Sequence, residues 1–270
     1  MICPLPHNLL FEEAESMAFN QTAETIKIAL LADCEIQQFI PLLKALFRQG
    51  NFEAVIYVAI LDGPELKDFR PESALFAFKP DLIVALNSLQ SLRDQYYRHA
   101  GLPAEFLCEH RLRMARVWAY IQANSTALII QANFADPIER IYERYALQLS
   151  SSLPRIVTRL NGFISLQIEN SDRIRLLDIH QMASAAGLQQ WFAEASPESA
   201  IAFCASEYLP LVAESILDIF MSFQEASLEG VNLGLEGLTW GEIIREDAMN
   251  TEPEDFFSSN YQTISIILSE

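Results

Sequence analysis

Cys34 is the residue of this 270-residue chain that most suggests chemistry, because it follows the apolar run at residues 26–31 at a tight turn. An amphipathic stretch, residues 35–50, begins directly after it. Backbone N–H groups and the dipole at a helix N-terminus favour a thiolate, which would make Cys34 a nucleophile. A buried, inert thiol is the common alternative for a cysteine, and the sequence leaves both interpretations open.

Other candidates follow later apolar runs and are suited to stabilising an oxyanion or activating the thiol. The side-chain amide of Asn87 and the backbone N–H of Gly63 could each donate to an oxyanion, although both residue types are frequent in turns. His180 could act as general base for Cys34, with Asp178 as its partner, in the logic of a catalytic triad. Asp178 and His180 are two residues apart, so on an extended chain their side chains would point to the same face. A structural histidine at a strand end is the alternative.

Metal and phosphate sites have no comparable pattern in the sequence. Cys108 and His110 are close together, but no further ligand completes a zinc site. His7 and His99 have no evident carboxylate or cysteine cluster. No glycine-rich phosphate loop follows any apolar run. We therefore expect no metal and no cofactor.

Short apolar runs alternate with longer amphipathic stretches, and these are the elements that must position the candidate residues. The predicted strands are residues 26–31, 52–60, 81–86, 126–131 and 173–179, and the predicted helices are residues 35–50, 103–123, 137–169 and 198–224. Strands buried on both faces and separated by helices predict an α/β fold with a doubly wound, mostly parallel five-stranded sheet. In such sheets the site lies beyond the carboxyl ends of the strands, where the candidate residues fall.

The net charge of −18 is spread unevenly along the chain. Residues 176–270 hold 16 acidic residues against Arg245 alone, whereas residues 93–175 hold eleven arginines against eight acidic residues. An acidic chain is a poor nucleic-acid binder, because neutralising phosphates dominates that affinity. The Arg93–Arg175 region could dock an acidic protein or a phosphate group. A helical surface laced with salt bridges is the alternative.

The N-terminal stretch and the cysteines predict a cytoplasmic protein without membrane spans. MICPLPHNLLFEEAESMAFN lacks the basic and apolar regions of a signal peptide, and no apolar run approaches the length of a membrane span. The four cysteines show neither paired nor disulfide-framework spacing, so reduced thiols are expected.

Four longer stretches carry a family resemblance when they are taken together. They are IKIALLADCEIQQFIPLLKALFRQGNFEAVIY, PESALFAFKPDLIVAL, LIIQANFADP and RLNGFISLQIENSDRIRLLDIHQMASAAG. As a set they resemble the FkbH-like family of natural-product assembly lines, which joins an N-terminal SGNH-hydrolase-like domain to a C-terminal HAD-type phosphatase domain. The resemblance implies a flavodoxin/SGNH-hydrolase-like sheet. It also implies an N-terminal extension at 1–25, an SGNH-hydrolase-like domain at 26–225 and an acidic appendage at 226–270.

The stretch VNLGLEGLTWGEIIREDA, residues 231–248, resembles a phosphatase entry motif that has lost its catalytic residues. The family's motif resembles Leu-Asp-Leu-Asp-Asn-Thr-Leu-Trp-Gly-Gly, and we anchor it on Trp240-Gly241. The nucleophilic aspartate position then falls on Gly234 and the acid/base position on Glu236. A glycine has no carboxylate to attack phosphorus or to hold Mg²⁺. The resemblance therefore implies neither phosphatase activity nor the glyceryl loading of the full-length family.

In the SGNH-like domain the resemblance departs from the esterase pattern at the nucleophile. The first SGNH block reads Gly-Asp-Ser, whereas this chain reads Ala32-Asp33-Cys34, which puts a thiol where the serine hydroxyl would be. The third-block asparagine falls on Asn87. The final Asp-x-x-His block has no counterpart in residues 187–203, so His180 would have to substitute for its histidine.

The resemblance implies two functions of different classes. The first is acyl transfer, or thioester or ester hydrolysis, on carrier-protein-bound intermediates of polyketide-type biosynthesis, through a Cys34 nucleophile. The second is a non-catalytic pseudoenzyme that binds an acyl carrier protein or a synthase module as a scaffold. Because carrier proteins are usually acidic, docking on the Arg93–Arg175 region is expected in both cases.

Overall fold

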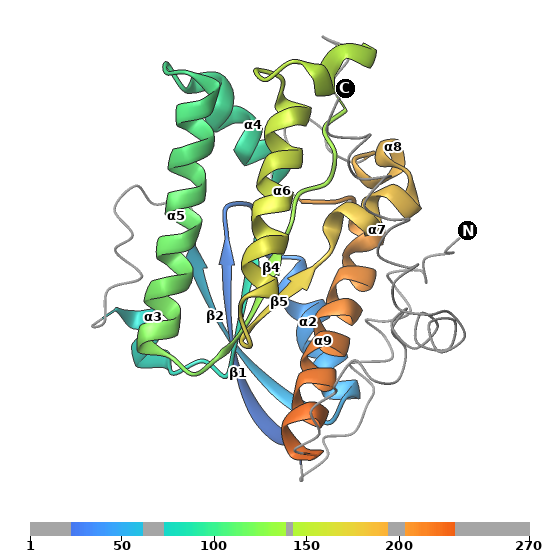
Figure 1. Ribbon diagram of the computed structural model, residues 1–270. Coiled ribbons are helices and arrows are strands. Elements are labelled where there is room, and N and C mark those ends of the chain that lie inside the picture. The colour runs from blue at the N-terminus through green and yellow to red at the C-terminus, as the bar shows by residue number, and fades with distance from the viewer. Residues whose placement is uncertain (1–22, 62–72, 139–142, 194–202, 230–270) are drawn as a thin grey trace, which may run out of the picture. The chain divides into compact units, whose positions relative to one another are not determined.

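The computed structural model describes residues 23–61, 73–138, 143–193 and 203–229, and its centre is a parallel five-stranded sheet (Figure 1). The strand order is β2-β1-β3-β4-β5, and helices flank the sheet. The strands are β1 (Glu24–Ala32), β2 (Phe52–Ile60), β3 (Leu82–Leu86), β4 (Leu128–Ala132) and β5 (Ile174–Leu177). The predicted α/β fold with a doubly wound parallel sheet is confirmed. The chain divides into two compact units, residues 1–221 and 222–270.

The predicted helices at 35–50 and 103–123 lie close to observed helices, while the short helices were not predicted. The helix predicted at 198–224 begins only at Leu209, after a 3₁₀ turn at Ser206–Tyr208. The helices are α2 (Phe39–Gln49), α3 (Ala74–Phe78), α4 (Leu89–Arg98), α5 (Pro103–Asn124), α6 (Leu153–Glu169), α7 (Ile179–Ala186), α8 (Leu188–Trp191) and α9 (Leu209–Glu229), with 3₁₀ turns η2 (Glu143–Gln148) and η3 (Ser206–Tyr208). The predicted helix at 137–169 is wrong in its first half, because Ser152 caps a new helix there by accepting from Arg155 N–H. No helix in the described part of the chain is both long and apolar enough to span a membrane.

The interior strands explain why the sheet is readable from the sequence. Every residue of β3 and of β4 is buried, so both strands are nearly continuous apolar runs, as parallel strands covered on both faces require. The edge strand β2 is different, because only Ala54 and Ala59 of its residues are buried. β5 ends at Leu177, two residues earlier than predicted.

The loop after β4 is fixed to α6 by one side chain. Asn161 Oδ1 accepts from the Phe134 N–H at 3.0 Å, and Asn161 Nδ2 donates to the Phe134 carbonyl at 2.8 Å. Phe134 is only 1% exposed, so its backbone groups depend on this amide. The pair of hydrogen bonds holds the segment that carries Asn133 at the carboxyl edge of the sheet.

We expect Asn161→Ala to lower the free energy of unfolding by about 2–4 kcal/mol, because it leaves a buried N–H and a buried carbonyl unpaired. The measurement is urea-induced unfolding of the full chain. Asn170→Ala is the matched control, since the Asn170 amide bonds a carbonyl of its own helix at an exposed position. Equal losses in both variants would contradict this role of Asn161.

Candidate functional site

A hydrogen bond between two strand ends builds the candidate site. The Ser88 N–H, directly after β3 and Asn87, donates to the Asp33 Oδ1 at 2.6 Å, and the Asp33 N–H donates to the Leu86 carbonyl at 3.4 Å. The bonds tie the end of β1 to the end of β3. Cys34 and Asn87, each next to a bonded residue, therefore lie at the same part of the carboxyl edge, as the parallel sheet predicts.

Cys34 is a protonated thiol, which corrects the expectation of a thiolate at a helix N-terminus. The helix α2 begins only at Phe39, after its N-cap at Gln38, so no helix start reaches the thiol. Burial, followed by the negative charge of Asp33, raises the pKa of Cys34 to about 12, and a hydrogen bond from the backbone of Phe203 opposes this in part. At that pKa about one thiol in 10⁵ is ionised at pH 7.

A second cysteine lies in the same part of the molecule. Cys204 is 3% exposed and follows Phe203, whose backbone reaches the Cys34 sulfur. Burial first, and then the charge of Cys34, raises the pKa of Cys204 well above its usual range. Both thiols are reduced. Sequence reasoning did not single out Cys204, because the two cysteines are far apart along the chain.

Asn87 belongs to a chain of buried polar groups. It is 8% exposed, and its Oδ1 accepts from the Gln131 Nε2 at 3.4 Å. The Gln131 Oε1 in turn accepts from the Trp118 Nε1 at 2.9 Å. With its Oδ1 used in this way, Asn87 has its amide nitrogen as the group suited to an oxyanion.

His110 lies beside these groups, although the sequence gave no reason to place it there. A cavity of about 20 Å³, room for roughly one water molecule, is lined by Asp33, Leu61, Asn87, His110, Arg113, Met114, Val117, Trp118 and Gln131. His110 falls on the apolar stripe of α5, and that periodicity is the signal that could have found it. Burial, and secondarily the charge of Arg113, lowers the pKa of His110 to about 3. A neutral imidazole with so low a pKa is a poor general base near neutral pH.

Asp178 and His180 follow β5, at the carboxyl edge of the sheet. They lie at the start of a helix and not in an extended strand, so the predicted triad geometry is wrong. Asp178 is the N-cap of α7, and its Oδ1 accepts from Gln181 N–H at 3.0 Å and from Asn133 Nδ2 at 2.8 Å. The His180 Nδ1 lies 3.6 Å from the Asp136 Oδ1. Among the described residues, no hydrogen bond or ion pair joins the His180 ring to Cys34.

Other predicted features lie outside the described residues. Gly63 is one of them, and the stretch 231–248 that resembles a phosphatase entry motif is another. In the described part of the chain, no group of three or more His, Cys, Asp or Glu side chains could hold a metal ion.

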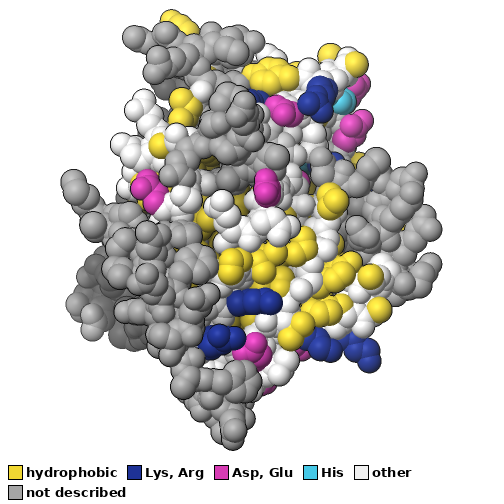
Figure 2. Space-filling view, turned by 180° about the vertical axis from the view of Figure 1, so that it is seen from behind, with side chains coloured by type: hydrophobic (Ala, Val, Ile, Leu, Met, Phe, Trp, Pro, Cys, Tyr) yellow, Lys and Arg dark blue, Asp and Glu magenta, His cyan; other side chains and the backbone are white. Residues whose placement is uncertain are grey.

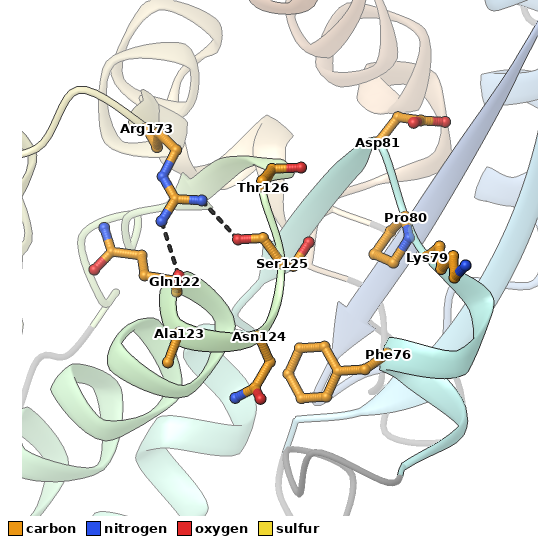
Figure 3. A pocket seen from close by; sticks show the side chains of 10 residues that line it. All are labelled: Phe76, Lys79, Pro80, Asp81, Gln122, Ala123, Asn124, Ser125, Thr126 and Arg173. Carbon is orange, nitrogen blue, oxygen red and sulfur yellow. Dashed lines mark hydrogen bonds between the residues drawn. The ribbon is translucent and has the colours of Figure 1, made fainter.

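A larger cavity of about 640 Å³ opens at the opposite, amino edge of the sheet (Figure 3). Two of its charged residues, Arg173 and Asp81, form hydrogen bonds within the fold. Arg173 donates to the Ser125 carbonyl at 2.6 Å and to the Gln122 carbonyl at 2.9 Å, which ties the end of α5 to the start of β5. Asp81 accepts from the Lys27 N–H at 2.8 Å. The bonds of Arg173 therefore give this cavity a role in holding α5 against β5, at the edge of the sheet opposite to Cys34.

The chain is similar to one known protein family and to several solved structures. A family model described as "FkbH, N-terminal domain" matches residues 27–221. The N-terminal part of BF1531 from Bacteroides fragilis, which contains a phosphatase domain and was solved with Mg, superposes with a TM-score of 0.70 at 18% identity. The match covers 80% of this chain and 56% of that one, so this chain spans little more than half of the solved part of BF1531.

An esterase of known structure has the same fold. A variant of Axe2, an acetyl-xylooligosaccharide esterase from Geobacillus stearothermophilus, gives a TM-score of 0.51 at 12% identity, over 74% of this chain and 95% of that chain. At this identity the likeness identifies the fold alone. No curated protein sequence matches the chain.

The pKa of His110 predicts a specific pH dependence of stability. Because the unfolded chain protonates this histidine near pH 6.5 and the folded chain only near pH 3, the stabilisation is present above pH 6.5 and is lost as the pH falls through this window. The loss is about 1.4 kcal/mol per pH unit. Urea unfolding at pH 7, 6 and 5 should show a steeper fall in the wild type than in His110→Gln, and the difference should be about half this slope from pH 7 to 6 and approach it from pH 6 to 5. Identical slopes in the two proteins would rule out a buried neutral His110.

The pKa of Cys34 predicts slow alkylation. Iodoacetamide near neutral pH should modify the exposed Cys108 well before Cys34, because the thiolate is the reacting form. From pH 7 to 10 the rate at Cys34 should rise about tenfold per pH unit without a plateau. Peptide mass spectrometry of the two sites gives both rates. A plateau for Cys34 below pH 9 would mean that its pKa is not raised.

Proposed function

Because the chain belongs to the FkbH N-terminal domain family, we propose that it takes an acyl group from the thioester of an acyl carrier protein onto Cys34. The group then passes to an alcohol, an amine or water, in a polyketide-type pathway. One observation carries the proposal, the placement of Cys34 at the carboxyl end of β1. There the 2.6 Å bond from the Ser88 N–H to Asp33 joins the segment that carries Cys34 to the segment that carries Asn87. Sites of parallel α/β sheets form at this edge.

The transfer would proceed by thioester exchange. The Cys34 sulfur attacks the carbonyl carbon and forms a new carbon–sulfur bond, while its proton goes to a base. The carrier thiolate then leaves with the electron pair of the broken bond and takes up a proton. Asn87, and Gly63 as predicted from the sequence, would donate to the oxyanion of the tetrahedral intermediate. A second nucleophile releases the acyl group from Cys34 by the same chemistry.

Proton removal is the demanding step of this scheme. With a pKa of about 12, very little of Cys34 is ionised near neutral pH. It therefore reacts only if a base takes its proton as the carbon–sulfur bond forms. The hydrogen bond from the Phe203 backbone favours the thiolate and so supports attack. His180 remains the base expected from the sequence. Its ring would have to leave the carboxylate of Asp136 to reach the thiol.

Docking of the acidic carrier protein is proposed for the exposed arginines of the Arg93–Arg175 region. Several arginines there already serve the fold, as Arg111 does by donating to the Arg159 carbonyl at 2.8 Å. Arg98 at the end of α4 and Arg116 on α5 have exposed side chains. They are therefore the charges best placed to meet an acidic partner.

A non-catalytic scaffold is the second candidate function. It is favoured by the protonated, partly buried state of Cys34 and by the pairing of the His180 ring with Asp136. In this case the domain would bind a carrier protein or a synthase module through the same arginines without any covalent step.

Incubation of the full chain with an acylated carrier protein tests the proposal, with intact mass spectrometry as the readout. We expect a mass increase equal to the acyl group, which Cys34→Ala abolishes and Cys108→Ala retains. The control is matched because Cys108 is a thiol exposed to solvent.

Two outcomes would overturn the thiol mechanism. Acyl transfer that continues unchanged in Cys34→Ala would show that another group is the nucleophile. Micromolar binding of the carrier protein without any adduct or turnover would establish the scaffold function instead.

A further inference from the structure

The edge strand β2 exposes apolar side chains. Val55 and Val58 are each 42% exposed and Ile60 is 68% exposed. In the described part of the chain β2 pairs with β1 alone, so one side of its backbone has no strand partner. Apolar side chains also gather on the back of the molecule in Figure 2, the side on which β2 forms the edge of the sheet.

The backbone groups on the open side of β2 can be assigned from the register. At one end the Leu61 N–H donates to the Ala32 carbonyl at 2.9 Å, and at the other the Asn51 carbonyl accepts from the Glu24 N–H at 3.3 Å. The odd-numbered residues of β2 therefore point their backbone groups to β1. The even-numbered residues present their N–H and carbonyl groups outward: Phe52, Ala54, Ile56, Val58 and Ile60.

This edge lacks the features that usually prevent strand pairing. Natural edge strands are blunted by lysine, proline, bulges or short length. β2 is nine residues long and reads FEAVIYVAI, with neither lysine nor proline. Its one charged residue, Glu53, is paired to Arg48 at 3.4 Å. An exposed edge of this kind is suited to pairing with another strand.

We propose that β2 pairs antiparallel with β2 of a second copy of this chain, about a two-fold axis at Ile56. The outward-pointing residues are spaced symmetrically around Ile56, so this axis places every one of them opposite another. All outward N–H and carbonyl groups of the strand are then satisfied. A two-fold contact of this type uses the same surface on both copies, which makes a closed dimer.

The side chains match in the same register. Ile60 faces the partner's Phe52 and Val58 faces the partner's Ala54 on one side of the joined sheet, while Val55 faces the partner's Tyr57 on the other. Each exposed aliphatic side chain thus meets an apolar one, which is the kind of cross-strand pair that stabilises sheets.

Charge does not oppose the pairing. Glu53 faces the partner's Ala59, so no two like charges oppose each other across the new ladder. Most of the negative charge of the chain lies in residues 176–270 and not in β2. A second copy therefore fits the strand better than a charged partner, which would find no counter-charge along it.

The mass of the full chain in solution tests the proposal. Analytical ultracentrifugation should give twice the 30.5 kDa of one chain at high micromolar concentration and dissociation on dilution, because an interface of one strand edge is small. Val58→Lys and Ile60→Lys should each abolish the dimer, while Leu166→Lys, at an exposed leucine of α6, should retain it. Circular dichroism confirms that each variant is folded. A folded wild type that stays monomeric at these concentrations would overturn the proposal.

Cross-linking tests the register independently of the lysine variants. In a Cys108→Ser background, Ile56→Cys should form a covalent dimer with glutathione disulfide, because opposed antiparallel residues have Cα atoms about 5.5 Å apart. Val58→Cys should not, because its two copies would lie about 14 Å apart along the strands. Cross-linking at Val58→Cys without cross-linking at Ile56→Cys would overturn the register. Dimers that survive both lysine variants would instead place another segment or face at the interface.

Discussion

The hydrogen bond from the Ser88 N–H to the Asp33 carboxylate is the constraint on which the geometry of the strand ends depends. At 2.6 Å it joins the segment after β1 to the segment after β3, two neighbours in the sheet that are far apart in sequence. Cys34 and Asn87 are the residues next to the two bonded partners. The bond therefore brings the two segments that carry them to the same edge of the sheet, and Asp33, the residue before Cys34, adds its charge to the surroundings of the thiol.

That charge and the burial of the site set the chemistry of Cys34. Burial raises the pKa of the thiol, Asp33 raises it further, and the hydrogen bond from the Phe203 backbone opposes both. The protonated Cys34 thiol is a poor nucleophile, but it can react when a base removes its proton during attack. The same burial keeps His110 neutral, so it can offer a hydrogen bond but not act as a strong base. Any reaction at Cys34 therefore depends on a base that takes the thiol proton.

The sheet and the site differ in how far the sequence predicts them. β3 and β4 are readable because every residue is buried and the apolar run is unbroken. His180 was misplaced because an Ile at position 179 continues the apolar run, while the capping of α7 by Asp178 depends on Asn133, a residue from the end of β4. His110 was overlooked because its neighbours at the cavity outside α5 come from the ends of four strands, β1 to β4. The local periodicity of apolar residues predicts the helices and strands. It cannot predict hydrogen bonds and contacts between side chains of segments that are far apart in the sequence.

The most direct test of the account is a carrier protein whose arm ends in a chloroacetamide in place of the acyl thioester. Docking should hold this electrophile at the carboxyl edge of β1 and alkylate Cys34, identified by peptide mass spectrometry. The exposed Cys108 should remain unmodified at matched concentrations. Cross-linking at Cys108 in preference to Cys34, or none at either residue while the carrier protein is bound, would contradict the assignment of Cys34 as the acyl acceptor.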